Sequence, residues 1–327
     1  MSFNEIKGQD RAIKILKQAI TNNHLAQTYL FHGPEGVGKK KAAITFAKAL
    51  NCTTHENDAC DQCLSCRKIE QSIHPDISLL QQDKGEIKIG AIRDIINSMV
   101  YRPIEARKRV VIVDEADKCN ISASNAFLKT LEEPPVDTVI ILISSGPDTL
   151  PQTVLSRCHK VSFGNVPTQT VAEMLMQLKG LSQAEAESVA CLADGSIGKA
   201  ITLSSADVKE VREDILAGVA KGYRDPYLLF EMAERFSKDE NGFYNALYWI
   251  HTYFRDILIL KSHGDFTLLI NKDMTDHFLK RRDQMTIERL LDIMGFIQSV
   301  YKGQERNVNK QLALEVLGTK IGDNQWK

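Results

Sequence analysis

Two unbroken runs of aliphatic residues constrain the fold of this chain more than any other feature. Val110–Val113 and Thr138–Ser144 are hydrophobic at nearly every position and lack the alternation of a half-exposed strand. Such runs are typical of strands that are buried on both faces of a parallel sheet. Segments 28–32 and 77–80 predict two more strands, and helical patterns separate the strands at about 10–22, 40–50, 89–100 and 122–132. Residues 1–165 are therefore predicted to form an α/β domain with a helix-covered parallel sheet.

The pattern changes after residue 165, where strand-like runs almost disappear. Hydrophobic residues then recur at helical spacing over about 168–178, 182–193, 196–203, 208–219, 225–236, 241–261, 286–301 and 309–318. Pro167 and Gly195–Gly198 mark joints between these helices. We expect a small all-α domain over 166–204 and a second all-α domain over 205–327, a division that suits a chain of 327 residues.

Composition and charge exclude several classes of protein. The chain is 43% hydrophobic and 25% charged, which is ordinary for a globular protein and not for a disordered one. No apolar run approaches the ~20 residues that cross a bilayer, and the polar N-terminus lacks the apolar stretch of a signal peptide. We therefore expect a cytoplasmic protein without a membrane partner. A net charge of −1 provides no overall attraction to nucleic acid.

A glycine-rich segment follows the first strand and opens the next helix. Gly33, Gly36, Gly38, Lys39 and Lys40 match the phosphate-loop pattern G-x-x-x-x-G-K-[ST] except at its last position. The glycines would let backbone N–H groups converge on phosphate oxygens, and Lys39 would contact the outer phosphates. Lys40 replaces the hydroxyl that binds Mg²⁺, and an ammonium group can only donate. We expect weak binding of ATP and Mg²⁺ and poor or absent hydrolysis; a glycine turn without a ligand is the alternative.

Two acidic residues end the strand at 110–113. Asp114 and Glu115 occupy the positions at which nucleotide hydrolases carry the carboxylates that position Mg²⁺ and polarise the attacking water. A solvated strand end would explain this pair alone, but the glycine loop upstream favours the nucleotide-site interpretation. Because Lys40 is a cation, Asp114 can instead form an ion pair.

Four of the seven cysteines fall in one short segment after the glycine-loop helix. Cys52, Cys60, Cys63 and Cys66 can supply the four thiolates of a closed, tetrahedral and therefore structural Zn²⁺ site. An odd number of cysteines in a chain expected in the cytoplasm argues against disulfides. The sequence predicts a zinc module over 52–66, and four unrelated thiols are the alternative.

Four stretches, in their order along the chain, resemble one family of proteins. They are 24–33 (HLAQTYLFHG), the cysteine module, 124–135 (SNAFLKTLEEPP) and 150–158 (LPQTVLSRC). The chain resembles the AAA+ clamp-loader subunits of bacterial DNA polymerase III over nearly its whole length. This resemblance implies an N-terminal AAA+ domain with a phosphate loop and a parallel sheet, followed by an all-α lid domain and an all-α collar domain for oligomerisation.

The resemblance also implies roles for individual residues. Arg157 matches the arginine that clamp-loader subunits extend into the ATP site of a neighbour, where a guanidinium stabilises charge on the transferring phosphoryl group. Ser144 or Ser145 matches the sensor position that contacts the γ-phosphate or the catalytic water. Taken alone, Arg157 would be one half of a surface ion pair, and the serines would be simple strand-end hydroxyls.

Two positions depart from the family members that act as motors. The gamma and tau subunits have Thr or Ser where this chain has Lys40, and their lid arginine lies in a Gly-Ser-x-Arg stretch that here ends in Gly198. A site without the Mg²⁺-binding hydroxyl and the lid arginine would not easily complete hydrolysis. Retention of Arg157 suits a subunit that serves its neighbour.

Three functions are compatible with these features. The first is a largely non-hydrolysing clamp-loader subunit, with gamma/tau and delta subunits as partners and with the sliding clamp and primer–template DNA contacted through the complex. The second is an active clamp-loader ATPase similar to gamma/tau, in which Lys40 is tolerated. The third is a zinc-stabilised nucleic-acid-binding module without nucleotide dependence, against which the near-neutral charge argues.

Overall fold

The computed structural model describes residues 2–81, 86–204, 206–222, 226–238, 240–262, 264–302 and 309–322. Two compact units make up the chain, the first formed by 1–174 with 193–199 and the second by 175–192 with 200–327. The first unit contains the sheet and the second is helical. The division into three domains at 165 and 204 stays a prediction, and residues 205, 223–225, 239, 263, 303–308 and 323–327 of its third domain lie outside the described residues.

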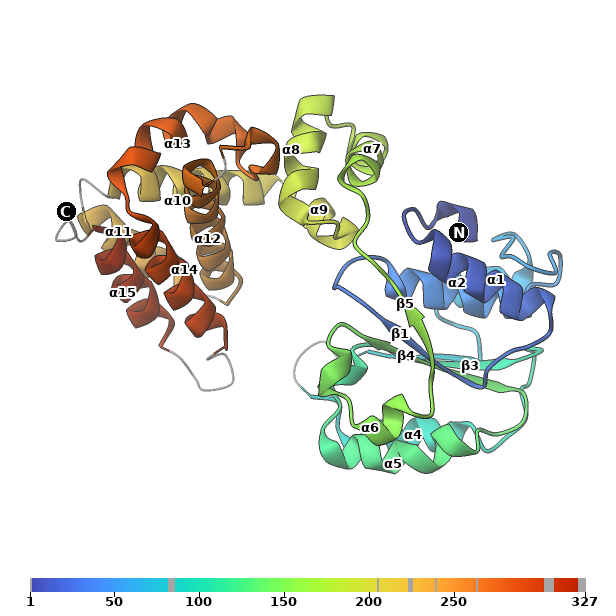
Figure 1. The fold of residues 1–327 in the computed structure, drawn as a ribbon. Coiled ribbons are helices and arrows are strands. Elements are labelled where there is room, and N and C mark those ends of the chain that lie inside the picture. Colours follow the sequence, from blue (N-terminus) through green and yellow to red (C-terminus); the bar gives the residue numbers. More distant parts are fainter. Residues whose placement is uncertain are drawn as a thin grey trace. The chain divides into compact units, whose positions relative to one another are not determined.

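A five-stranded parallel sheet forms the centre of the first unit (Figure 1). Its strands are β1 (Thr28–His32), β2 (Ile77–Leu80), β3 (Arg109–Val113), β4 (Thr138–Ser144) and β5 (His159–Ser162), in the order β2-β3-β4-β1-β5. All adjacent strands are parallel, and Thr28 of β1 lies opposite Ile140 of β4. Every residue of β3 and β4 is buried. The helix-covered parallel sheet predicted from these two runs is confirmed.

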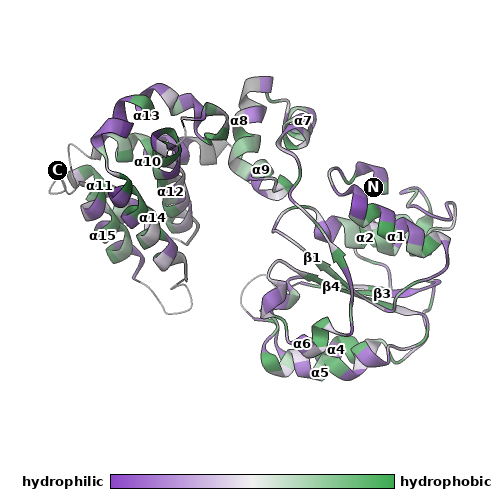
Figure 2. Ribbon diagram, viewed as in Figure 1, coloured by the Kyte–Doolittle hydropathy of each residue, from purple (hydrophilic) through white to green (hydrophobic). Residues whose placement is uncertain are grey.

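Helices cover both faces of the sheet. On one face, α1 (Asp10–Thr21) and α2 (Lys39–Asn51) pack over side chains such as Phe31. On the other, α4 (Ile89–Ser98), α5 (Ile121–Glu132) and α6 (Gln152–Leu155) pack over side chains such as Leu30. Successive residues of a strand point to opposite faces, so each central strand contributes to both cores. Figure 2 shows hydrophobic residues concentrated on the central strands and on the helix faces that cover them.

The remaining helices lie in the cysteine segment and in the C-terminal half. They are α3 (Leu64–Glu70), α7 (Thr168–Lys179), α8 (Gln183–Ala193), α9 (Ile197–Leu203), α10 (Ala206–Gly222), α11 (Pro226–Phe236), α12 (Glu240–Ser262), α13 (Thr275–Arg281), α14 (Ile287–Lys302) and α15 (Lys310–Gly322). Trp249, Tyr253 and Phe254 of α12 are buried and contribute to the core of the helical unit. Among the described residues, no helix combines the length and the apolar character that crossing a membrane requires.

Strand order determines where the candidate site lies. In a parallel sheet all strands end at the same edge, where ligands of α/β proteins usually bind. The phosphate loop follows β1, Asp114 follows β3, and Ser145 follows β4. Because β1 and β3 both neighbour β4, these three chain segments meet at one edge of the sheet.

Candidate functional site

The phosphate-loop glycines have backbone conformations that other residues rarely adopt. The φ angles of Gly33, Gly36 and Gly38 are 144°, 73° and 102°. A Cβ atom at Gly33 would lie 2.0 Å from the carbonyl oxygen of Phe163, and one at Gly36 would lie 2.2 Å from Oγ of Ser196. Both positions therefore require glycine. Gly38 is the N-cap of α2, so the loop runs directly into a helix N-terminus, the arrangement that favours bound anions.

Lys39 folds back onto its own loop. Its Nζ donates to the carbonyl oxygens of Gly33 and Pro34, at 2.6 Å each, and to Oγ of Ser145 at 3.0 Å. These contacts use all three N–H bonds of the ammonium group. Burial lowers the pKa of Lys39, an effect that nearby carboxylates partly offset. A phosphate group at this position would have to replace one of the three acceptors.

Lys40 contacts the carboxylate that would otherwise hold Mg²⁺. Its Nζ lies 3.3 Å from Oδ2 of Asp114 and also donates to Oε1 of Gln81, the residue after β2. The ion pair anticipated for Asp114 is therefore present. A carboxylate paired with an ammonium group attracts a divalent cation less strongly, because the cation is also repelled by the lysine. Gln81 was not predicted, since nothing in the sequence links it to a residue on α2.

Glu115 has a local partner. Its φ of 52° is left-handed, and its carboxylate lies 2.7 Å from Nζ of Lys118 on the next turn of the chain. Its backbone N–H donates to Oδ1 of Asp114 at 3.1 Å. Each of the two acids predicted from the sequence thus pairs with a different lysine: Asp114 with Lys40, and Glu115 with Lys118.

The end of β4 brings a serine to the site. The hydroxyl of Ser145 accepts from Lys39, and its backbone N–H donates to Oδ1 of Asp117 at 3.1 Å. The preceding Ser144 is fully buried, and its Oγ has no hydrogen-bond partner in the described part of the chain. The sequence left both serines as candidates for the sensor position, and the structure places Ser145 in contact with the phosphate-loop lysine.

The start of α9 lies against the phosphate loop. The backbone N–H of Gly198 donates to the carbonyl oxygen of Gly36 at 2.9 Å. A Cβ atom at Gly198 would lie 3.2 Å from Cα of Gly36, closer than ordinary van der Waals contact. Gly198, the residue expected from the resemblance to replace a lid arginine, therefore packs backbone to backbone against the phosphate loop.

Arg157 follows α6 and is bound by residues of its own unit. Its Nε donates to Oε1 of Glu132 at 2.7 Å, and its Nη2 donates to the same oxygen. Its Nη1 donates to the carbonyl oxygen of Thr153 at 2.6 Å and to Oγ of Ser156 at 3.3 Å. The Arg157 side chain is 31% exposed. Within the described residues it forms no hydrogen bond or ion pair with its own phosphate loop.

The four cysteines predicted as ligands converge. The Sγ atoms of Cys52, Cys60, Cys63 and Cys66 all lie within 4.8 Å of one another. Zinc with Zn–S bonds of about 2.3 Å would place tetrahedral sulfurs about 3.8 Å apart, which is close to the observed arrangement. The cluster is therefore compatible with a structural zinc site.

Backbone N–H groups point at three of these sulfurs. Sγ of Cys52 accepts from His55 at 3.3 Å, Sγ of Cys60 from Cys63 at 3.2 Å, and Sγ of Cys63 from Cys66 at 3.4 Å. Burial raises the pKa of Cys63, but hydrogen bonds donated to its sulfur outweigh this and lower the pKa to about 5. The protein thus favours the thiolate, the form that binds metal ions, at Cys63, whereas burial raises the pKa of Cys66. The side chain of His55 is exposed, as expected for a residue that is not a ligand.

A buried lysine connects the cysteine segment to α2. The side chain of Lys48 is 1% exposed, and its Nζ lies 2.5 Å from Oδ1 of Asp61 and also pairs with Glu70. Asp61 lies between the cysteines, and Glu70 ends α3, the helix that carries Cys66. The two hydrogen-bonded partners fix the position of this buried ammonium group, because an unpaired charge there would make folding less favourable. The sequence analysis missed this contact, since a lysine on a helix usually faces solvent.

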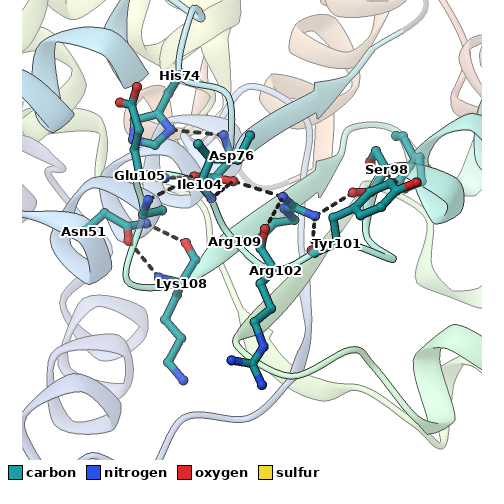
Figure 3. A network of polar contacts seen from close by, with 12 residues as sticks. Asn51, His74, Asp76, Ser98, Tyr101, Arg102, Ile104, Glu105, Lys108 and Arg109 are labelled. Carbon is teal, nitrogen blue, oxygen red and sulfur yellow. Dashed lines mark hydrogen bonds and ion pairs between the residues drawn. The ribbon is translucent and has the colours of Figure 1, made fainter.

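A second buried polar network is centred on Asp76 and Arg109 (Figure 3). The carboxylate of Asp76 accepts from the backbone N–H groups of 104–106 and from Nη2 of Arg109, the last at 3.0 Å. Nη1 of Arg109 donates to the carbonyl oxygens of Ser98 and Tyr101. Burial raises the pKa of Asp76, but these donors outweigh it and lower the pKa to about 2. The network joins the end of α4 to the start of β3, and nothing in the sequence predicts it.

Comparisons with known proteins agree with this architecture. The family model for the DNA polymerase III delta subunit matches residues 8–167, and the model for the C-terminal part of that subunit matches 207–321. The Bacillus subtilis delta-prime subunit is 29% identical over 94% of each chain. The Pseudomonas aeruginosa delta-prime subunit is 32% identical over 64% of this chain and 65% of its own length.

The chain is also similar to a tau subunit. The Bacillus subtilis protein is 26% identical over 98% of this chain, which spans 61% of that protein's length. The delta-prime subunit of the same organism is instead matched along nearly its whole length. Together with the two family models, this match establishes that the chain belongs to the delta-prime subunit family of bacterial DNA polymerase III.

Proposed function

We propose that this chain acts in DNA replication as a clamp-loader subunit that does not hydrolyse ATP itself and that donates Arg157 to the ATP site of a neighbouring subunit. Membership of the delta-prime family supports the clamp-loader role. In this role the chain assembles with gamma/tau and delta subunits and contacts the sliding clamp and primer–template DNA through the complex.

The observation that carries the proposal is the pairing of Lys40 with Asp114. Hydrolysis in phosphate-loop enzymes needs Mg²⁺ held between a loop hydroxyl and the acid at the end of another strand of the sheet. Here the hydroxyl is replaced by an ammonium group, which lies 3.3 Å from that acid. The backbone contact of Gly198 with Gly36 adds a second reason, because it leaves no lid arginine at the loop. Any nucleotide in this loop is therefore a weakly held, static ligand.

The exposure of Arg157 supports its role as a donor. A guanidinium is permanently charged and can stabilise the charge that develops on a transferring phosphoryl group. Arg157 has solvent access and forms no polar contact with its own phosphate loop among the described residues. These features suit a side chain that serves a site supplied by another chain.

Reconstitution with purified gamma/tau and delta subunits tests the proposal. Arg157→Ala should lower ATP turnover at the affected site by about 10³-fold, the lower end for loss of an arginine finger. Arg107→Ala removes an equally charged, exposed side chain and should leave the rate unchanged. An unchanged rate with Arg157→Ala would refute the donor role, and rapid ATP turnover by the isolated chain would favour the active-ATPase alternative.

The cysteine cluster is proposed to hold a structural Zn²⁺ ion. Four thiolates leave no position for a reacting water, so the metal would cross-link the segment without taking part in catalysis. The supporting observations are the convergence of the four sulfurs and the N–H groups directed at them.

A further inference from the structure

We infer that Glu132 is a positioning residue that holds Arg157 away from the neighbour's ATP site when no nucleotide is bound there; we call this state of Arg157 parked. A phosphate of the neighbour's nucleotide then displaces the Glu132 carboxylate from Arg157. The inference rests on the proposed function of Arg157 as a donor. It concerns a contact between the end of α5 and the turn after α6, both of which lie in the first compact unit.

Counting donors shows that Arg157 is not free to bind a phosphate as it stands. A guanidinium has five N–H bonds. The bond on Nε and one on Nη2 go to Glu132, and both bonds on Nη1 go to Thr153 and Ser156. One N–H of Nη2 is left, whereas tight recognition of a phosphate uses two parallel N–H bonds. Engagement of a phosphate therefore requires that one existing partner leaves.

Glu132 is the partner most easily exchanged. The carbonyl oxygen of Thr153 and the hydroxyl of Ser156 belong to the same turn as Arg157, so they move with it. Glu132 lies 25 residues away in sequence, and its side chain is 49% exposed. Ion pairs that are this exposed stabilise little. A phosphate offers the same acceptor chemistry with more negative charge, so it can replace the carboxylate.

The position of Glu132 on its helix agrees with a role other than stability. It is the last residue of α5, and another acid, Glu133, follows it. Carboxylates are unfavourable at a helix C-terminus because the backbone carbonyl dipoles there are also negative. Arg157 offsets this local repulsion while it is parked. When Arg157 leaves Glu132, two acids remain at the end of α5. Their repulsion favours the return of Arg157 to Glu132 once the neighbour's nucleotide has gone.

The test uses the reconstituted assembly and the variants Glu132→Gln and Glu133→Gln. Glu133 is the matched control, since it is adjacent, exposed and equally charged, and no polar side-chain contact of it is present among the described residues. Without DNA, Glu132→Gln should raise the ATPase rate of the assembly about threefold, the effect expected for removing one exposed ion pair. Glu133→Gln should leave the rate unchanged. The double variant with Arg157→Ala should be as slow as Arg157→Ala alone.

A second measurement uses the isolated chain and does not depend on assembly. Phenylglyoxal reacts with accessible guanidinium groups, and mass spectrometry of peptides gives the rate at Arg157. Glu132→Gln should speed this modification, while Glu133→Gln should not.

The outcomes separate the two ideas. If Arg157→Ala abolishes activity but Glu132→Gln changes neither the ATPase rate nor the modification rate, Arg157 is a donor and the parking role of Glu132 is wrong. A lower ATPase rate with Glu132→Gln would also overturn parking, because it would mean that the carboxylate orients Arg157 in the active state. If Arg157→Ala has no effect, the proposed function itself fails.

Discussion

At the scale of single residues, the proposal that this chain does not hydrolyse ATP rests on Lys40. Its ammonium group lies 3.3 Å from Oδ2 of Asp114 and bonds to Gln81, so the acid expected to hold Mg²⁺ is already paired with a cation. The sequence was sufficient to anticipate the ion pair of Lys40 with Asp114, because the substituted position lies inside a motif with a fixed geometry. The partner Gln81 could not be predicted, since 41 residues separate it from Lys40 and only the packing of β2 beside β3 brings it close.

Replacing Lys40 by threonine should strengthen nucleotide binding. Lys40→Thr restores a hydroxyl and frees Asp114, so binding of Mg²⁺ with ATP should tighten about fivefold, as expected if about 1 kcal/mol of charge repulsion is removed. Titration of the isolated chain with a fluorescent ATP analogue in the presence of Mg²⁺ measures this. Lys41→Thr, which changes the same charge at an exposed neighbouring position, serves as control. Equal affinities for both variants would mean that Lys40 does not weaken the site.

Asp76 provides a prediction on pH. Because the pKa of Asp76 is about 2 in the folded chain, below its usual value of 3.8, the folded state favours the ionised form. This contribution, about 2 kcal/mol, is present above pH 4 and is lost as the pH falls toward 2. Asp76→Asn should lower the free energy of unfolding by about 3 kcal/mol at pH 7, as for other broken buried ion pairs, and should flatten the decline between pH 4 and 2. Denaturant unfolding at several pH values checks both effects.

Asp137 supplies the control for Asp76. It is an exposed acid whose partner, Lys108, is also on the surface. Asp137→Asn should change stability much less than Asp76→Asn does. If both variants lost similar amounts of unfolding free energy, the buried network of Figure 3 would be no more stabilising than a surface ion pair.

At the scale of elements, the strands and helices that the sequence predicts are those in which buried residues follow a continuous pattern. β4 was expected at 138–144 and lies there, because burial on both faces requires an unbroken apolar run. β5 was not expected, since it is an edge strand in which only Val161 is buried. The short helices α3 and α13 were missed for a related reason, as about two turns carry too few apolar positions to define a period.

The cysteine segment is the element whose stability should depend on a ligand. Removing zinc with a chelator should make residues 52–71 sensitive to proteases while the far-UV circular dichroism of the rest is retained, because the metal cross-links only this segment. Cys63→Ser should have the same effect as chelation, whereas Cys119→Ser, a change outside the cluster, should not. Mass spectrometry of the cleavage sites and metal analysis check this prediction. Loss of the whole fold on chelation, or no bound zinc, would contradict it.

At the scale of the whole molecule, the proposed function assigns the two candidate sites of the chain to different active centres. The phosphate loop, Lys40 and Asp114 form one candidate site, in which the ammonium group of Lys40 pairs with the acid that would hold Mg²⁺. Arg157 lies after β4 and α6 and is bound by Glu132. Under the proposed function, the chain contributes to catalysis only within an assembly.

This division leads to a prediction about the assembly that contrasts two residues of the same chain. Lys39→Met removes the ammonium group that any phosphate-loop enzyme needs, yet it should leave ATP turnover by the reconstituted complex at the wild-type value, because the neighbour performs the hydrolysis. Arg157→Ala in the same preparation should remove turnover at the neighbour's site. Since Lys39 also bonds to the carbonyl oxygens of Gly33 and Pro34, thermal melting must first show that the variant is folded. A loss of turnover with folded Lys39→Met as large as that with Arg157→Ala would mean that this chain hydrolyses ATP, and the division between the two sites would be wrong.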